Sequence, residues 1–274
     1  MSTAFARIFP ACRPIVGMIA LPPLVGRAGV EAPDEIVARA LSDLETLEQG
    51  GVDGVCLEND YDRPSQLTAS PEVVACFTLV AQRVTRRAKV PVGLQVLPHD
   101  WRASLAIARR TGARFVRLDQ FVDRVRIAAG VVEPEPEAVI AYREHIGAGD
   151  VALLADIQVK HSELLEPGKS IGTSARQAMA GGADAIIVTG RVTGEPPSLA
   201  DLEAARAAAG DFPVLVGSGV TPDNARELLR LADGAIVGTA LRESAAAEAR
   251  VVLSRVRRLV AVVESLAGGW EHRH

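Results

Sequence analysis

Aromatic residues are scarce in this chain of 274 residues: they make up 4% of it, as two Trp, two Tyr and six Phe. A core built on large rings is therefore excluded, and the apolar 48% of the chain must pack mainly as Ala, Val, Leu and Ile. Such side chains suit closely packed parallel strands and the helices that cover them. The length also matches one α/β barrel, which typically takes roughly 250 residues.

Lysine is almost absent. The chain holds only Lys89, Lys160 and Lys169 and takes the rest of its positive charge from arginine, and its formal net charge is -4. A surface that binds nucleic acid usually needs a clustered basic patch, so this composition argues against a nucleic-acid partner.

Cysteine is scarce as well, and Cys12, Cys56 and Cys76 have no metal-type spacing. This odd number of thiols predicts reduced cysteines in a cytoplasmic protein. No apolar run approaches the ~20 residues that span a bilayer, so we predict no integral membrane segment. Pro10, Pro14, Pro22 and Pro23 keep the apolar run near the N-terminus short, which disfavours a signal peptide.

The chain does contain a regular alternation of short apolar runs with longer amphipathic ones, which is typical of strands and helices in turn. The predicted strands are Ile15–Leu21, Gly54–Glu58, Val92–Leu97, Phe115–Leu118, Val151–Asp156, Ala185–Val188, Val214–Val216 and Ala235–Val237. Helical patterns cover approximately residues 34–50, 70–88, 101–111, 135–146, 172–181, 198–209, 222–231 and 247–267. Eight βα units with short links predict a parallel sheet closed into a (β/α)8 TIM barrel.

We predict one barrel domain over residues 14–267, with a lead-in at 1–13 and a flexible tail at 268–274. The alternative is a doubly wound open sheet. That fold would need a Gly-x-Gly-x-x-Gly turn after its first strand, where this chain has Leu21-Pro22-Pro23.

Two glycine-containing turns follow the last two predicted strands and predict phosphate-binding loops after strands 7 and 8. The first turn brings Gly217, Ser218 and Gly219, and the second brings Gly238 and Thr239, which would open a short extra helix. Glycine lets backbone N–H groups approach an anion closely, and barrels of this class often bind phosphate at this position. The alternative is that Thr221 and Pro222 are merely the N-cap and first residue of the seventh helix.

Polar residues at the ends of other strands are candidates for chemistry, because barrel enzymes keep their catalytic groups there. Glu58 is a candidate acid or base, and Asp156 and His161 are further catalytic candidates. Asp156, Gln158 and Lys160 alternate, so we expect them to share one face of an extended strand. Lys160 could act as a substrate-charge clamp, a general acid or a Schiff-base nucleophile, or it could form an ion pair with Asp156 or Glu58.

The remaining candidates are predicted to bind substrate. They are Asn59, Asp100, Arg117, Asp119, Thr189 and Gly190. Asp100 could instead be the N-cap of the helix that begins at Trp101. Glu58, Asp119 and Asp156 could hold Mg²⁺, but no spacing signature supports a metal, and we predict neither a metal nor another cofactor.

Several segments resemble the BtpA/SgcQ family of barrels over most of the chain. The segments that carry the resemblance are 51–59, 156–161, 188–194, 217–220 and 233–238. The resemblance implies a β/α barrel, a name linked to photosystem I biogenesis in cyanobacteria, and relatives resembling sugar-metabolism or nucleosidase-like proteins. Positions that match the family pattern are Glu58, Asn59, Asp100, Arg117, Asp156, Lys160 and His161.

This chain departs from the family pattern at several strand ends. Ala20 stands where the pattern has histidine, Gln95 where it has asparagine, Pro98-His99 where it has Arg-Asn, and Asp119 where it has asparagine. These changes affect several groups expected to face the barrel lumen. We therefore predict a divergent member with an altered substrate or reaction.

Two functions remain open at this point. The first is an enzyme that acts on a small phosphorylated sugar or nucleoside by isomerase, lyase or glycosidase-like chemistry. The second is a non-catalytic assembly or regulatory barrel that binds a ligand. The apolar residues Val251 to Val263 exceed one buried stripe and predict a homo-oligomer contact.

Overall fold

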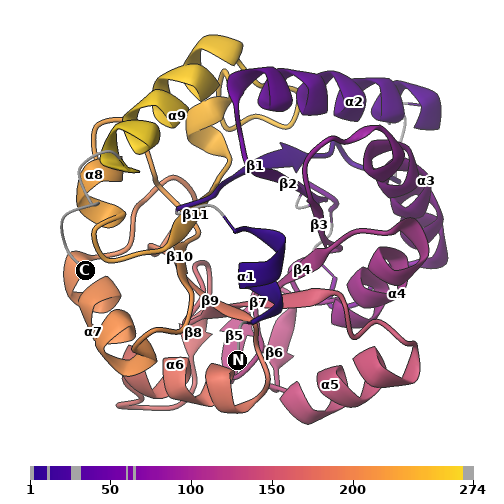
Figure 1. Cartoon of the computed structure of the whole chain (residues 1–274). Coiled ribbons are helices and arrows are strands. Elements are labelled where there is room, and N and C mark those ends of the chain that lie inside the picture. The colour runs from indigo at the N-terminus through magenta and orange to yellow at the C-terminus, as the bar shows by residue number, and fades with distance from the viewer. Residues whose placement is uncertain (1–2, 11–12, 26–31, 60, 64–65, 268–274) are drawn as a thin grey trace.

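Eight parallel strands close into a barrel in the order β1-β11-β10-β9-β7-β4-β3-β2, which confirms the predicted (β/α)8 fold (Figure 1). The computed structural model describes residues 3–10, 13–25, 32–59, 61–63 and 66–267, so Cys12 and the predicted tail at 268–274 lie outside the described residues. The barrel strands are β1 (Ile15–Ala20), β2 (Gly54–Glu58), β3 (Val92–Gln95), β4 (Phe115–Leu118), β7 (Ala152–Ile157), β9 (Ala185–Val188), β10 (Val214–Val216) and β11 (Gly234–Val237).

Helices surround the barrel on its outside (Figure 1). They are α2 (Pro33–Gly50), α3 (Pro71–Arg87), α4 (Trp101–Thr111), α5 (Pro136–His145), α6 (Ile171–Ala180), α7 (Leu199–Ala209), α8 (Ala225–Leu228) and α9 (Leu253–Ala267). Serine side chains cap the starts of α3, α6 and α7, each accepting a hydrogen bond from an amide in the first turn. The helix predicted over 222–231 is only Ala225–Leu228 in the structure, and its N-cap is Asn224 and not the predicted Thr221.

A short helix, α1 (Ala4–Ile8), closes the amino-terminal end of the barrel. Its Phe5 and the adjoining Phe9 are buried with the lumen-facing residues of the strands, and the rings of Phe9 and Phe115 lie 5.7 Å apart. Gly93 makes room for this layer, since a Cβ there would lie 1.9 Å from the Phe115 ring. The predicted lead-in therefore contains a helix that plugs the barrel.

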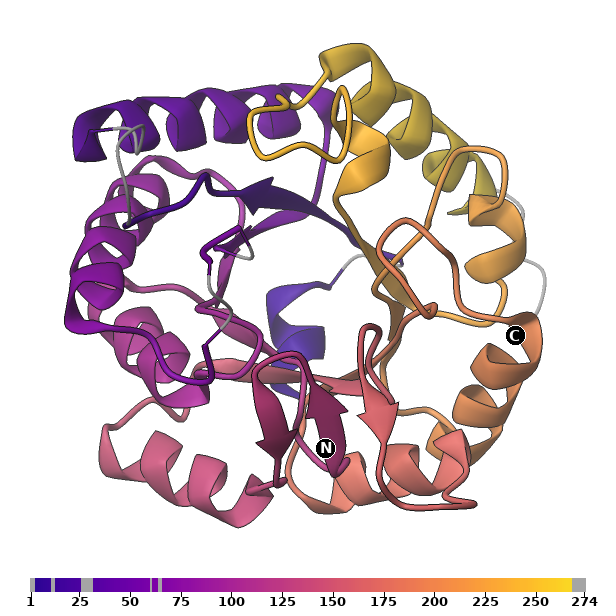
Figure 2. The same ribbon diagram turned by 180° about the vertical axis from the view of Figure 1, so that it is seen from behind.

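A small antiparallel sheet lies at the opposite end and was not predicted from the sequence. It consists of β5 (Val125–Ile127), β6 (Gly130–Val132) and β8 (Glu163–Leu164), in the order β6-β5-β8. Figures 1 and 2 view the barrel from its two ends, with α1 in front in the first and the small sheet in front in the second. The sheet joins the segment after β4 to the segment after β7.

The apolar side chains of α9 pack within the chain. Val256 and Leu259 are fully buried. Val256 packs directly on Gly50, since a Cβ at position 50 would lie 2.2 Å from the Val256 side chain. Val260 and Val263 are also buried. The apolar excess that led us to predict a homo-oligomer is thus largely accounted for by contacts with α2 and α8, and oligomerisation remains a prediction without that support.

Candidate functional site

The carboxyl ends of the barrel strands surround a cavity of about 540 Å³. Most of the residues predicted from the sequence meet in its lining. Those that line it are Glu58, Asn59, Arg117, Asp119, Lys160, His161, Gly217, Ser218, Gly219, Gly238 and Thr239. Asp100, Asp156, Thr189 and Gly190 are not among its lining residues.

Two runs of residues that line this cavity, 218–220 and 238–240, have backbone amides without an internal acceptor. Within the described part of the chain, no group accepts a hydrogen bond from the amides of residues 218–220 or 238–240. The predicted helix after β11 is a single 3₁₀ turn, Thr239–Leu241, so any anion there would be held by the amides themselves. Unpartnered amides at the edge of a cavity are suited to binding phosphate oxygens.

The loop after β9 is fastened to the loop after β10. The Ser218 hydroxyl donates to the Glu195 carbonyl at 2.7 Å and accepts from the Gly190 amide at 2.7 Å. Gly219 adopts φ +66°, and a Cβ there would lie 2.1 Å from the Pro196 nitrogen. Only glycine fits this conformation and this contact. Ser218 and Gly190 therefore secure the loop that brings Thr193 to the cavity.

Arg117 and Asp156 form a buried ion pair below the cavity. The guanidinium donates to both carboxylate oxygens at 2.8 Å, and its Nε also lies 3.7 Å from Asp119. Burial alone would lower the pKa of Arg117, but Asp156 holds it well above its ordinary value. Asp156 is 1% exposed and directed at Arg117, so it does not form the ion pair with Lys160 that the sequence left open.

The expected alternation of Asp156, Gln158 and Lys160 on one face is wrong. Strand β7 ends at Ile157, and Gln158 then adopts φ +46°, which breaks the extended path. The Gln158 side chain points away from the cavity to the Lys169 carbonyl and the Ser174 hydroxyl. Lys160 does line the cavity, and its amide donates to Thr189 Oγ1 at 3.0 Å. Thr189 thus holds the Lys160 backbone from outside the cavity lining.

The Lys160 ammonium has no ion pair with Glu58 or Asp156. His161, at φ +58°, lies beside it, and its Nε2 accepts from the Thr193 amide at 3.2 Å and lies 2.9 Å from Thr193 Oγ1. This contact joins the loop after β7 to the loop after β9.

Asn59 and Asp100 act largely within the protein. Asn59 donates to Asp62 and accepts from the Leu97 amide. Asp100 caps α4 by accepting from the Ala103 amide at 2.9 Å, as the alternative interpretation had it, and its other oxygen accepts from the Ala69 amide.

Other lining residues were not predicted as site residues. Gln95 donates to Asp119 at 2.5 Å, and His99 Nδ1 is hydrogen-bonded to the Gln120 side chain. Gln95, His99 and Gln120 all line the cavity, and Gln95 contacts Asp119 directly. The sequence signal for Gln95 and His99 was their position at the end of a strand, where the chain departs from the family pattern.

Among the described residues, no group of three His, Cys, Asp or Glu side chains is arranged to hold a metal ion. Of the three carboxylates considered for Mg²⁺, Asp156 pairs with Arg117 and does not line the cavity, whereas Glu58 and Asp119 do. The described part of the chain also has no helix with the length and apolarity to cross a membrane.

The profile of the BtpA family matches residues 11–265. The chain belongs to the BtpA family. This BtpA-family chain is 36% identical to an uncharacterised protein of Pyrococcus furiosus over 93% of its own length and 97% of the relative's. It is 35% identical to the photosystem I biogenesis protein BtpA of Synechocystis, over 85% and 82% of the two chains.

Solved structures with the same fold are more distant in sequence. The (S)-3-O-geranylgeranylglyceryl phosphate synthase of Thermoplasma acidophilum, in complex with its substrate sn-glycerol-1-phosphate, superimposes with a TM-score of 0.63 at 14% identity, covering 97% and 99% of the two chains. The N-(5'-phosphoribosyl)anthranilate isomerase of Pyrococcus furiosus gives 0.56 at 13% identity, covering 92% and 99%. At this identity the likeness establishes the barrel fold alone.

Proposed function

We propose that this BtpA-family barrel is an enzyme that acts on a small phosphorylated sugar or nucleoside at the carboxyl end of its strands. The observation that carries the proposal is the pair of amide runs, 218–220 and 238–240, which face one cavity without acceptors. Buried or half-buried amides normally find a partner, so six unpartnered ones at one cavity suit an anionic ligand.

The other side of the cavity carries the groups that would do chemistry. Glu58 and Asp119 are carboxylates, and Lys160 is the one lysine in the described lining. A carboxylate and an amine near a bound sugar can move protons in isomerisation, aldol-type cleavage or C–N or C–O bond cleavage. In this proposal Asp156 acts only through Arg117, whose charge it balances, and Arg117 in turn lies beside Asp119.

The structural neighbours support the phosphorylated substrate class without specifying it. The synthase binds sn-glycerol-1-phosphate, and the isomerase is named for a phosphoribosyl compound. Barrels of this fold often hold phosphate in the loops after their last two strands.

The test is thermal unfolding with and without a panel of phosphorylated sugars, nucleoside monophosphates and their dephosphorylated counterparts. A ligand at about 100 times its Kd should stabilise the protein by roughly 2.7 kcal/mol. We expect stabilisation by one phosphorylated class and none by its dephosphorylated form, followed by turnover that Lys160→Ala reduces. Equal turnover of both forms would contradict the proposal, because a phosphate handle should contribute to kcat.

A second candidate function rests on the Synechocystis relative, whose name assigns it to photosystem I biogenesis. An assembly role would use the cavity for a ligand and would tolerate Lys160→Ala. Ligand binding without any turnover, and an assembly role that Lys160→Ala leaves unchanged, would favour this alternative over the enzyme.

A further inference from the structure

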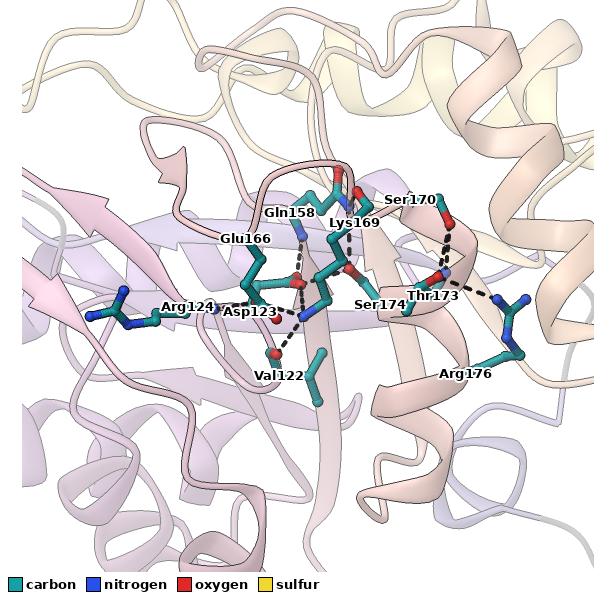
Figure 3. Close-up of polar contacts among 10 residues, drawn as sticks. All are labelled: Val122, Asp123, Arg124, Gln158, Glu166, Lys169, Ser170, Thr173, Ser174 and Arg176. Carbon is teal, nitrogen blue, oxygen red and sulfur yellow. Dashed lines mark hydrogen bonds and ion pairs between the residues drawn. The ribbon is translucent and has the colours of Figure 1, made fainter.

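A buried polar network outside the cavity centres on Lys169 (Figure 3). The Lys169 side chain is 6% exposed, and its ammonium contacts Asp123 at 2.8 Å, Glu166 at 2.8 Å and the Val122 carbonyl at 2.9 Å. Three acceptors use all three of its N–H groups. Burial alone would lower its pKa, but Asp123 and Glu166 raise it, so Lys169 is a charged structural cation with no donor left for a ligand.

Asp123 connects the network to the loop that carries Lys160. One of its oxygens accepts from the Ser174 hydroxyl at 2.6 Å and faces Lys169, and the other accepts from the Gln158 amide at 2.7 Å. The Gln158 side chain donates to the Lys169 carbonyl at 3.1 Å and to Ser174 Oγ at 3.3 Å. Gln158 is therefore held at both its backbone and its side chain (Figure 3).

Gln158 is one of two residues with positive φ that flank the segment containing Lys160; the other is His161. A residue other than glycine in this conformation costs free energy and persists only where its surroundings impose it. The Asp123 carboxylate imposes it here, because its oxygen fixes where the Gln158 amide points. A well-packed apolar core would be at least as stable as a buried ion pair, but it could not direct an amide in this way.

The same network anchors the small sheet that walls the cavity. Glu166 accepts from the Arg124 amide at 3.1 Å, next to the start of β5. At the end of β5, Ile127 and the following Ala128 line the cavity. One cluster thus fixes both the Lys160 segment and a part of the cavity wall.

We propose that Asp123 and Lys169 form a positioning unit that fixes the turn at Gln158 and thereby holds Lys160 at the cavity. The inference rests on the proposed function only in taking Lys160 as a working group. Asp123 and Lys169 are positioning residues, since neither lines the cavity.

The test uses the scarcity of lysine, because a chain with three lysines labelled at ¹³Cε gives three side-chain signals, which Lys89→Arg and Lys160→Arg assign. We compare Asp123→Asn, the milder Ser174→Ala and a matched control, Asp184→Asn. Asp184 accepts from the Ala4 and Leu153 amides and pairs with Arg143 at 3.1 Å. Like Asp123, it is a carboxylate that accepts from a backbone amide and pairs with a basic side chain, but it lies at the opposite end of the barrel.

We expect Asp123→Asn and Ser174→Ala to shift or broaden the Lys160 signal and to change the rate at which its amine reacts with trinitrobenzenesulfonate. Asp184→Asn should lower the Tm and leave both readouts unchanged. The proposal is overturned if Asp123→Asn shifts the Lys169 signal and leaves the Lys160 signal unchanged. It is also overturned if Asp184→Asn shifts the Lys160 signal to the same extent as Asp123→Asn. Should Asp123→Asn fail to fold, Ser174→Ala alone decides between these outcomes.

These readouts need no ligand and are therefore separable from the proposed function. Titration of the wild-type protein with inorganic phosphate tests the amide runs by themselves. Absence of phosphate binding would sink the proposed function and leave the positioning of Lys160 by Asp123 intact. Phosphate binding together with a Lys160 signal that Asp123→Asn leaves unchanged would overturn the positioning role and leave the proposed function intact.

Discussion

Arg117 is the buried cation on which the floor of the cavity depends. It is 3% exposed and has two carboxylate neighbours. Asp156 balances its charge, and Asp119 lines the cavity. A buried ion pair is costly to break, because the remaining charge loses its partner while it stays away from water.

We predict that Asp156→Ala lowers the free energy of unfolding by roughly 3–5 kcal/mol, since it leaves the Arg117 guanidinium buried and without its main partner. Urea unfolding of the variant would measure this loss. The double variant Arg117→Met, Asp156→Leu removes both charges and should recover much of the stability. A double variant less stable than Asp156→Ala would contradict this explanation.

Cys56 offers a prediction about pH. Burial in the lumen, with a smaller contribution from Glu58, raises the pKa of its thiol above the ordinary value of 9.0. A raised pKa keeps the group protonated at pH 8, and the thiolate is the reactive form. We expect iodoacetamide to leave Cys56 unmodified in the folded protein at pH 8 and to modify it in urea, as followed by peptide mass spectrometry. Equal modification in both states would show that the lumen is open to the reagent.

Single-residue roles were the hardest to predict from sequence. Strand alternation placed Asp156 and Lys160 on one face, but the positive φ of Gln158 separates them, and no residue type there announces that conformation. Asp100 and Thr189 were recognisable as polar residues at strand ends. Whether such a side chain faces a cavity or a neighbouring amide depends on loop contacts that the sequence does not display.

At the scale of elements, α1 closes the end of the barrel remote from the cavity. We predict that Phe9→Ala, which removes a ring packed on Phe115 and Phe5, costs about 3–5 kcal/mol of stability. Chemical denaturation measures the loss. Because α1 lies at the opposite end, affinity for phosphate should be unchanged in the folded variant, and a parallel loss of affinity would show that the two ends are coupled.

The loop after β9 depends on one hydroxyl. We predict that Ser218→Ala destabilises this loop, because the Gly190 amide and the Glu195 carbonyl lose their shared partner, at a cost of roughly 1–3 kcal/mol. Limited proteolysis should then cut within residues 190–197 faster than in the wild type. Ser198→Ala, which removes only the cap of α7, is the matched control. Equal cleavage in the two variants would assign no special role to Ser218.

Elements were predictable where their pattern was long or repeated. All eight barrel strands follow from apolar runs, and the helices between them follow from amphipathic periodicity. Strands β5, β6 and β8 have only three, three and two residues and carry exposed charges such as Arg126 and Glu163, so they give no hydrophobic signal. Helix α1 is only five residues long, and the burial of its Phe5 and of the adjoining Phe9 is explained only once the barrel is known.

At the scale of the whole molecule, the two ends of the barrel are built differently. One end is filled by α1 and aromatic rings, and the other opens into a cavity walled by loops from several strands. This division, with packing at the amino ends of the strands and polar groups at their carboxyl ends, is typical of barrel enzymes. Fold class and cavity position were therefore predictable together, whereas the substrate was not, because barrels of one fold carry many chemistries.

The central claim is that the amide runs 218–220 and 238–240 hold a phosphate. Gly238→Asp would place a carboxylate beside them, and Gly238→Asn is its neutral match; a Cβ at this position meets only Met18 at 3.4 Å.

The most direct measurement is an amide ¹H–¹⁵N NMR titration of the wild type and these two variants with inorganic phosphate. Our account predicts that the signals of both runs shift together in the wild type and in Gly238→Asn, and that Gly238→Asp abolishes the shifts through like-charge repulsion. Signals of both runs that stay in place while phosphate shifts amides elsewhere would contradict it.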